Sequence, residues 1–106
     1  MPKVKQITDT TGQYVSYVFH CPACKRHHSC YVERPDKRRP CWSFNGDLEK
    51  PTFTPSIVSL YGRDDEINVC HSFVCDGRIE FLSDCTHSLA GQTVDLPEVE
   101  ESANVG

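Results

Sequence analysis

The sequence predicts a mostly β protein, a small zinc-ribbon-like antiparallel domain with at most one short helical turn. Short runs of β-branched and aromatic residues alternate with Gly, Pro, Asn and Asp, and no segment keeps a 3.6-residue apolar period. Seven cysteines in 106 residues include an early Cys-x-x-Cys pair, which is typical of ribbons that hold a zinc ion. The helical turn is expected in "THSLAG", residues 86–91, where Gly91 would end it.

The first half of the chain predicts a two-stranded ribbon followed by a short strand. "YVSYVF", residues 14–19, is rich in strand-forming residues and leads directly into the Cys-x-x-Cys pair. "SCYVE", residues 29–33, would be the returning strand. "CWSFNG", residues 41–46, places two aromatic residues on one face and stops at an Asn-Gly turn.

The second half predicts an extended segment and then a hairpin. In "KPTFTPSIVSLYG", residues 50–62, two prolines exclude a helix and favour an extended edge segment that leads into a strand at residues 57–61. "INVCHSFVCDGRIEFLSDC", residues 67–85, contains Asp76-Gly77, a strong signal for a two-residue type I′ turn. This turn predicts that Cys75 faces Arg78.

The hairpin register follows from the pair Cys75 and Arg78, because each residue before Cys75 lies opposite the residue equally far after Arg78. On one face the predicted pairs are Val74 with Ile79 and Ser72 with Phe81. On the other face His71 lies opposite Leu82, with Asp84 diagonal to His71. The hairpin would therefore act as a scaffold that holds Cys70 and His71 in fixed positions.

The chain divides into one folded unit and two flanking segments. We expect an N-terminal arm at residues 1–12, a single metal-stapled β domain at residues 13–96 and an acidic disordered tail at residues 97–106, "PEVEESANVG". A domain of this size has a thin core and gains from a staple such as a metal.

Charge and hydropathy limit the classes of partner. The net charge of −4 argues against a general nucleic-acid binder. The basic loop "RPDKRRP", residues 34–40, is an exception that we interpret as a solvated connection. The N-terminus has no apolar signal region, and no stretch approaches the ~18 apolar residues of a membrane span. We expect a cytoplasmic protein, in the host cytoplasm if a phage encodes it.

The cysteines predict a zinc site. A reducing compartment and an odd number of thiols both favour a metal over disulfides. Cys21 and Cys24 supply two ligands from one turn, and Cys70 and His71 are the expected second pair. Neighbouring residues of a regular strand point to opposite faces, so this pair requires an irregularity such as a bulge.

Two other histidines are alternative ligands. His28 follows Cys24 at the short spacing of metal knuckles, and His87 follows Cys85 beyond the hairpin. A thiol redox motif at the Cys-x-x-Cys pair is disfavoured, because no helix follows it.

Several motifs resemble one family. "CPAC", "W-x-F-N-G", "PTFTPSI" and the run from Cys70 to Pro97 are similar to small phage and bacterial Cys/His-containing proteins of unknown function, some of them labelled ammonia monooxygenase. This chain is far too small and polar for that membrane enzyme. A related branch is found near bacterial ubiquitin-like conjugation genes. Its hairpin histidine aligns with His71, which implies that His71 is a ligand, whereas its cysteine aligns with Asn68 and not with Cys70.

Two functions follow from these expectations. In the first, a structural zinc with four protein ligands supports a protein-interaction module whose partner is a host or defence factor. In the second, the zinc keeps an open position and the protein is a zinc-dependent hydrolase, with Asp84 or His87 acting on bound water. The number of protein ligands distinguishes them, because four close the site and three leave room for water.

Overall fold

The structure, a computed structural model, describes residues 2–36, 39–63 and 66–99, except for the side chain of Arg63. These residues form eight strands in two antiparallel sheets and contain no helix. The predicted mostly β fold is confirmed. The segment expected to hold a helical turn instead makes two successive hydrogen-bonded turns, from Ala90 N–H to His87 C=O (3.3 Å) and from Gln92 N–H to Leu89 C=O (3.0 Å).

The first sheet has the order β1-β2-β3. Its strands are β1 (Lys5–Thr8), β2 (Val15–Cys21) and β3 (Arg26–Glu33). Strands β2 and β3 form the predicted ribbon, and the Cys-x-x-Cys turn lies at its tip. Part of the N-terminal segment 1–12 is the edge strand β1, and Val4 just before it is buried.

The second sheet has the order β4-β5-β6-β7-β8. Its strands are β4 (Ser43–Phe44), β5 (Phe53–Arg63), β6 (Glu66–Cys75), β7 (Arg78–Phe81) and β8 (Thr93–Asp95). The hairpin β6–β7 has the predicted register, with Cys75 opposite Arg78 and Ser72 opposite Phe81. Asp76 and Gly77 both have positive φ, 52° and 79°, as a type I′ turn requires.

The proline segment at the start of β5 differs from the expectation of an edge. Phe53 pairs with Val74 of β6 and with Phe44 of β4, so both sides of the chain are paired there. The ladder to β6 is then irregular between Phe53 and Ile57. This interruption accommodates Pro55, whose nitrogen has no hydrogen to donate.

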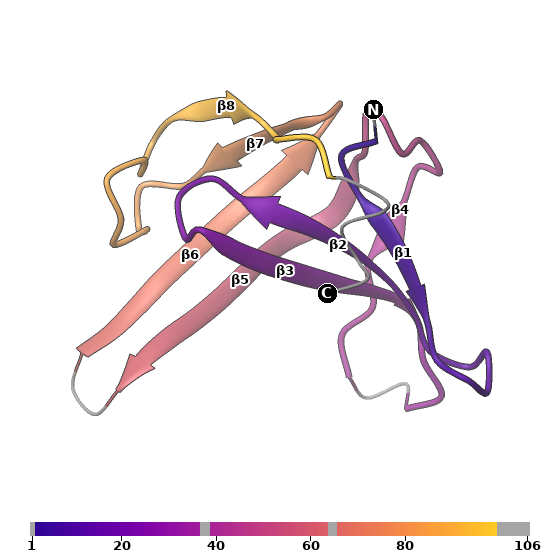
Figure 1. The fold of residues 1–106 in the computed structure, drawn as a ribbon. Coiled ribbons are helices and arrows are strands. Elements are labelled where there is room, and N and C mark those ends of the chain that lie inside the picture. Colours follow the sequence, from indigo (N-terminus) through magenta and orange to yellow (C-terminus); the bar gives the residue numbers. More distant parts are fainter. Residues whose placement is uncertain (1, 37–38, 64–65, 100–106) are drawn as a thin grey trace.

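The two sheets pack face to face around one core. In Figure 1, β2 and β3 cross the long β5–β6 pair. The contact between sheets includes the Phe19 and Phe53 rings, whose centroids are 6.4 Å apart. Phe81, Ile79 and Val74 complete the buried apolar centre on the side of the second sheet. This packing brings the Cys-x-x-Cys turn over one face of β6.

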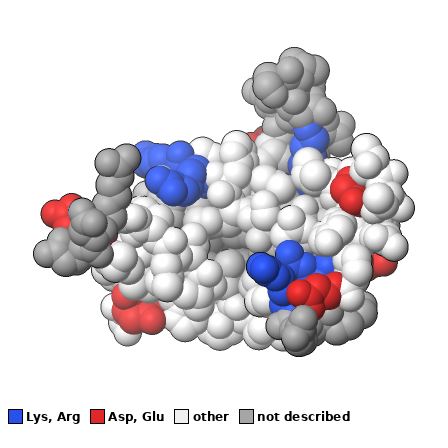
Figure 2. All heavy atoms as spheres, turned by 90° about the horizontal axis from the view of Figure 1, so that it is seen from below, with Lys and Arg blue, Asp and Glu red and all other residues white. Residues whose placement is uncertain are grey.

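Charged side chains form no continuous basic surface on the face that Figure 2 shows, where Lys and Arg occur in separate small groups. The basic loop 34–40 lies partly outside the described residues, at 37 and 38. The predicted acidic tail also lies outside them from residue 100 onward. No helix long and apolar enough to cross a membrane is present in the described part of the chain.

Candidate functional site

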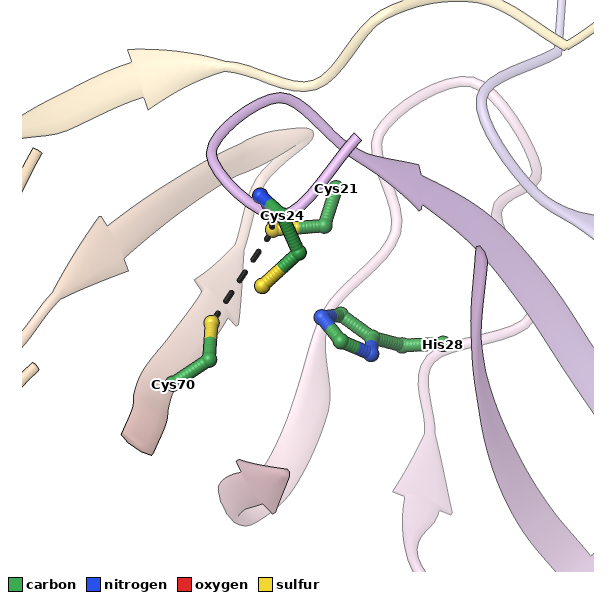
Figure 3. Close-up of side chains that lie close together, drawn as sticks. All are labelled: Cys21, Cys24, His28 and Cys70. Carbon is green, nitrogen blue, oxygen red and sulfur yellow. Dashed lines mark hydrogen bonds between the residues drawn. The ribbon is translucent and has the colours of Figure 1, made fainter. Parts of the chain in front are cut away.

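Three cysteines and a histidine meet between the two sheets. The ligand atoms of Cys21, Cys24, His28 and Cys70 all lie within 4.8 Å of one another. The Sγ atoms of Cys21 and Cys70 are 3.9 Å apart (Figure 3). Two thiolates on a tetrahedral zinc, each at ~2.3 Å from the ion, would be about 3.8 Å apart. The spacing therefore suits a tetrahedral metal ion, and we call this group the thiol cluster.

Local structure explains how the early ligands converge. Strand β2 ends at Cys21, and the chain reverses through Lys25, whose φ is 60°. The Lys25 N–H bonds to the Cys21 C=O (3.0 Å), and the Cys24 N–H bonds to the Cys21 Sγ (3.4 Å). His28 on β3 faces Phe19 on β2. It therefore shares a face with Cys21, because strand residues two apart point the same way.

The protonation of the thiol cluster also favours a cation. The hydrogen bond from Cys70 lowers the pKa of Cys21 to about 3, and the same bond raises the pKa of Cys70. Burial raises the pKa of Cys24. The buried Nε2 of His28 has no hydrogen-bond partner among the described residues. A metal ion would replace the shared proton and satisfy the imidazole, so this cluster can hold a metal ion.

His71 is not part of the thiol cluster. The β5–β6 ladder runs without a shift from Ile57 to Arg63, so no bulge turns His71 to the side of Cys70. The two neighbours point to opposite faces of β6. The place that the sequence assigned to His71 is taken by His28, one of the two alternatives.

The other alternative, His87, lies in a second group. Ligand atoms of Cys70, Cys85 and His87 are within 4.8 Å of one another, so Cys70 belongs to both groups. The Nδ1 of His87 accepts a hydrogen bond from the Leu89 N–H (3.2 Å), while its buried Nε2 has no partner among the described residues. This group offers three ligands, one of them shared.

On the opposite face of β6, His71 lies between a serine and a carboxylate. Its Nδ1 is 3.0 Å from Asp84 Oδ2, and its Nε2 is 3.0 Å from Ser56 Oγ. A carboxylate only accepts hydrogen bonds, so Nδ1 carries the proton, and Nε2 of the neutral ring accepts from the Ser56 hydroxyl. This is the order of contacts in a Ser-His-Asp triad.

Backbone and side-chain contacts hold the three members in place. The Trp42 indole N–H donates to the Ser56 carbonyl (3.2 Å). The His71 N–H donates to Cys85 Sγ (3.2 Å), and the Cys85 thiol donates to the His71 carbonyl (3.1 Å). Cys85, which follows Asp84 directly, therefore ties the end of the hairpin to the backbone of His71.

The triad is open to solvent. The side chain of His71 is 24% exposed and that of Asp84 is 59% exposed. Both groups are therefore accessible from solvent. The exposed carboxylate is partly screened by water, so it orients the imidazole mainly through the hydrogen bond.

The sequence interpretation missed Ser56 entirely. The hairpin register did predict that Asp84 lies near His71, and the contact at 3.0 Å agrees with it. Ser56 lies in "TPSI", which matches no nucleophile motif such as a glycine-flanked serine. Only the pairing of β5 with β6 brings this serine beside the histidine.

One family model matches residues 2–82, and its description is "Bacterial ubiquitination-like system serine protease (BubE)". The chain belongs to the BubE family. The predicted relation to proteins near ubiquitin-like conjugation genes is confirmed by this BubE match. The matched range contains the thiol cluster, Ser56 and His71, and it ends two residues before Asp84. No curated protein and no solved structure matches this chain significantly.

Proposed function

We propose that this BubE-family protein is a serine protease of a bacterial ubiquitination-like system, with Ser56 as the nucleophile. The observation that carries the proposal is the His71 ring, which is hydrogen-bonded at 3.0 Å to Ser56 through Nε2 and at 3.0 Å to Asp84 through Nδ1. The family description supports the reaction class and the kind of substrate. The substrate would be a protein that carries a conjugated or precursor ubiquitin-like segment.

Each member of the triad has one role in this proposal. His71 Nε2 takes the proton of the Ser56 hydroxyl as Oγ attacks the carbonyl carbon of the scissile amide. The imidazolium that forms is stabilised by Asp84, which also keeps the proton on Nδ1. His71 then passes the proton to the leaving amine, the C–N bond breaks, and an ester on Ser56 remains. Water, deprotonated by His71, hydrolyses the ester and regenerates the serine.

The thiol cluster has a structural role in the same proposal, with zinc as the metal. Its four ligands come from β2, the following turn, β3 and β6, so a bound ion would connect the two sheets. A zinc ion here supplies folding free energy and no reacting group. The neighbouring position of Cys70 and His71 means that the ion would fix the strand that carries the general base.

The two functions expected from sequence are less well supported. A zinc-dependent hydrolase needs an open metal position near Asp84 or His87. The thiol cluster offers four ligands, the three-ligand group of His87 has to share Cys70 with that cluster, and Asp84 is bonded to His71 on the other face. An interaction module without catalytic activity gives no reason for the hydrogen bonds that join Ser56, His71 and Asp84. A protein partner is retained in the proposal as the substrate, and action on a host or defence factor stays a prediction.

A small fluorophosphonate reagent tests the proposal directly, because it reacts with an activated serine and needs no knowledge of the substrate. We expect one adduct on purified protein, located at Ser56 by mass spectrometry. Ser56→Ala and His71→Gln should abolish the adduct. Ser88→Ala, which changes an exposed serine outside the triad, should retain it.

Two results would contradict the serine protease. One is an adduct that persists in Ser56→Ala. The other is a folded wild-type protein that remains unlabelled. Binding of a ubiquitin-like protein without any labelling would instead support the interaction module.

A further inference from the structure

The face of the second sheet that carries His71, here called the outer face, also carries apolar side chains. Val58 and Leu60 follow Ser56 at two-residue steps on β5, so they point to the same side as the nucleophile. Ile67 and Phe73 share a side with His71 on β6 for the same reason. Their exposed fractions are 53%, 64%, 53% and 42% in the order given, and we call the four residues the apolar stripe.

The apolar stripe is unusual for a solvent-facing surface. The solvent-facing side of an antiparallel sheet normally carries polar residues. Here it carries four large apolar side chains that lie together and are exposed in the described part of the chain. Large exposed apolar patches on soluble proteins mark interaction sites, so the apolar stripe is a candidate binding surface.

The apolar stripe is continuous with the triad. Val58 lies directly opposite His71 in the ladder, and Leu60 lies opposite Val69. Directly opposite side chains in an antiparallel pair are ~5 Å apart at Cβ, and residues two apart on one strand are about 6.8 Å apart. The stripe therefore passes beside the His71 imidazole: Val58 lies opposite it on β5, Phe73 follows it on β6, and Leu60 and Ile67 lie further along the sheet in the other direction.

The backbone of β5 is also free along one side. Strand β4 pairs only with Phe53 and Thr54, at the very start of β5. In the described part of the chain, no strand pairs with residues 57–62 of β5 on the side away from β6, and no loop backbone is hydrogen-bonded to them. Alternate N–H and C=O groups of an antiparallel strand point to each side, so this edge offers donors and acceptors. Ser56 stands at its beginning.

From these two features we propose that an extended segment of the protein substrate binds as an added strand along the free edge of β5. Alternate side chains of that segment, apolar in character, would rest beside Val58 and Leu60 on the apolar stripe. The proposal rests on the proposed serine protease, because Ser56 at the start of the edge defines where the scissile bond lies. Main-chain pairing would give affinity and the stripe would give selectivity, as in other cases of strand addition.

The occupant is a substrate segment for two reasons. A protease substrate must present an extended chain to reach the nucleophile, and the edge of β5 leads to Ser56 without a break in the strand. The apolar stripe lies on the same face as His71, so one segment can contact edge, stripe and triad together. A second copy of this chain would cover the stripe without any relation to Ser56.

The test compares two phosphonate probes on the intact protein. The first is the small fluorophosphonate, which reports the triad alone. The second is a peptidyl phosphonate with Leu and Val at alternate positions, and the measured quantity is the ratio of its labelling rate to that of the small probe. Using this ratio removes any effect of a variant on the triad or on folding. Failure of the small probe itself would count against the proposed function and not against the surface.

We expect Leu60→Ser to lower this ratio by about tenfold or more, the usual effect of losing an apolar contact in a binding site. Ile7→Ser is the matched control, because Ile7 is 44% exposed on the other sheet, and its ratio should stay at the wild-type value. A peptidyl probe with Ser at the alternate positions should label wild type about tenfold more slowly than the apolar probe.

The backbone part of the proposal has its own probe. Methylating alternate amide nitrogens of the peptidyl phosphonate should slow labelling in one of the two alternate sets and have little effect in the other, because only one set faces β5. Equal rates for both sets and the parent probe would overturn strand addition. An unchanged ratio in Leu60→Ser would overturn the role of the stripe in substrate binding. If the same variant also turns a dimer into a monomer, the stripe binds a second copy of the chain instead.

Discussion

Cys70 and His71 are neighbours on β6, and their side chains serve opposite faces of one sheet. Cys70 is 1% exposed and points into the thiol cluster, where the other ligands come from the first sheet. His71 is open to solvent and contacts Ser56 of β5 and Asp84 of the connection between β7 and β8. The inner face thus connects two sheets, whereas the outer face gathers residues of the second sheet and of one of its connections. The strand's two-residue period is enough to separate these two environments.

Under the proposed function, this difference assigns stability to one face and chemistry to the other. Substitutions on the inner face should unfold the protein, and activity should be lost as a consequence. Substitutions on the outer face should remove activity from a folded protein that still binds its metal. Four experiments test this separation, in order of decreasing expected effect.

The largest effect is expected from Cys21→Ser. Structural zinc contributes on the order of 10 kcal/mol to small metal domains, about as much as the total stability of a typical domain, so losing a ligand should leave no cooperative thermal unfolding transition. Cys75→Ser, at an exposed cysteine outside both ligand groups, should unfold as wild type. A folded, metal-free Cys21→Ser protein with normal labelling would remove the structural role of the thiol cluster.

His71→Gln is expected to have the next largest effect. Removal of the general base of a triad lowers kcat by ~10⁴-fold or more. Because His71 lies outside the thiol cluster, metal content and melting temperature should stay close to wild type. Elemental analysis and calorimetry on the same sample give both readouts. Loss of the metal in this variant would mean that His71 is a ligand after all.

A smaller loss is expected from Asp84→Asn. The neutral amide no longer stabilises the imidazolium and permits the wrong tautomer, which slows acyl transfer by ~10²-fold or more. Asp95→Asn is a suitable control, because this exposed carboxylate pairs with Arg78 away from the triad. Labelling rates with the small fluorophosphonate measure both variants. Equal rates would show that Asp84 has no part in the reaction.

The smallest effect is expected from Gly77→Ala in the turn between β6 and β7. Gly77 has a φ of +79°, and an added Cβ would lie 3.2 Å from the Glu49 carbonyl oxygen. We expect a loss of ~1–2 kcal/mol in unfolding free energy from denaturant titration. Both faces depend on this turn, so labelling rate per folded molecule and metal content should be unchanged together.

Gly12→Ala separates the two causes of that loss. Gly12 also has a positive φ, of 75°, but an added Cβ would have nothing within 4 Å. Its stability should therefore fall by less than that of Gly77→Ala. Equal losses would assign the whole effect to backbone conformation.

The patterns that could be predicted from the sequence are local ones. The Asp76-Gly77 turn predicts the register of the whole hairpin, and the structure has that register from Cys75 to Ser72. The Cys-x-x-Cys pair also predicts a tight turn at the tip of a ribbon, as found. In both cases the controlling interactions lie within a few residues of one another.

The partners of these local features could not be predicted in the same way. His28 and His71 are both a few residues from a cysteine, and spacing alone favoured His71, whereas the structure groups His28 with Cys70. Ser56 carries no motif and lies 15 residues from His71 in the chain. The position of Ser56 depends on the pairing of β5 with β6. This pairing was difficult to predict because two prolines lie near the start of β5 and favour an edge segment.

Composition and short-range pattern are therefore sufficient for the β fold, the hairpin register and the existence of a thiol pair suited to a metal, because each depends on turn chemistry or on the two-residue strand period. Which histidine joins the thiols, and which serine meets His71, was decided by the packing of the two sheets and by the β5–β6 ladder. Those choices depend on long-range contacts, whose energies come from burial and pairing across the whole domain and are not present in any short segment.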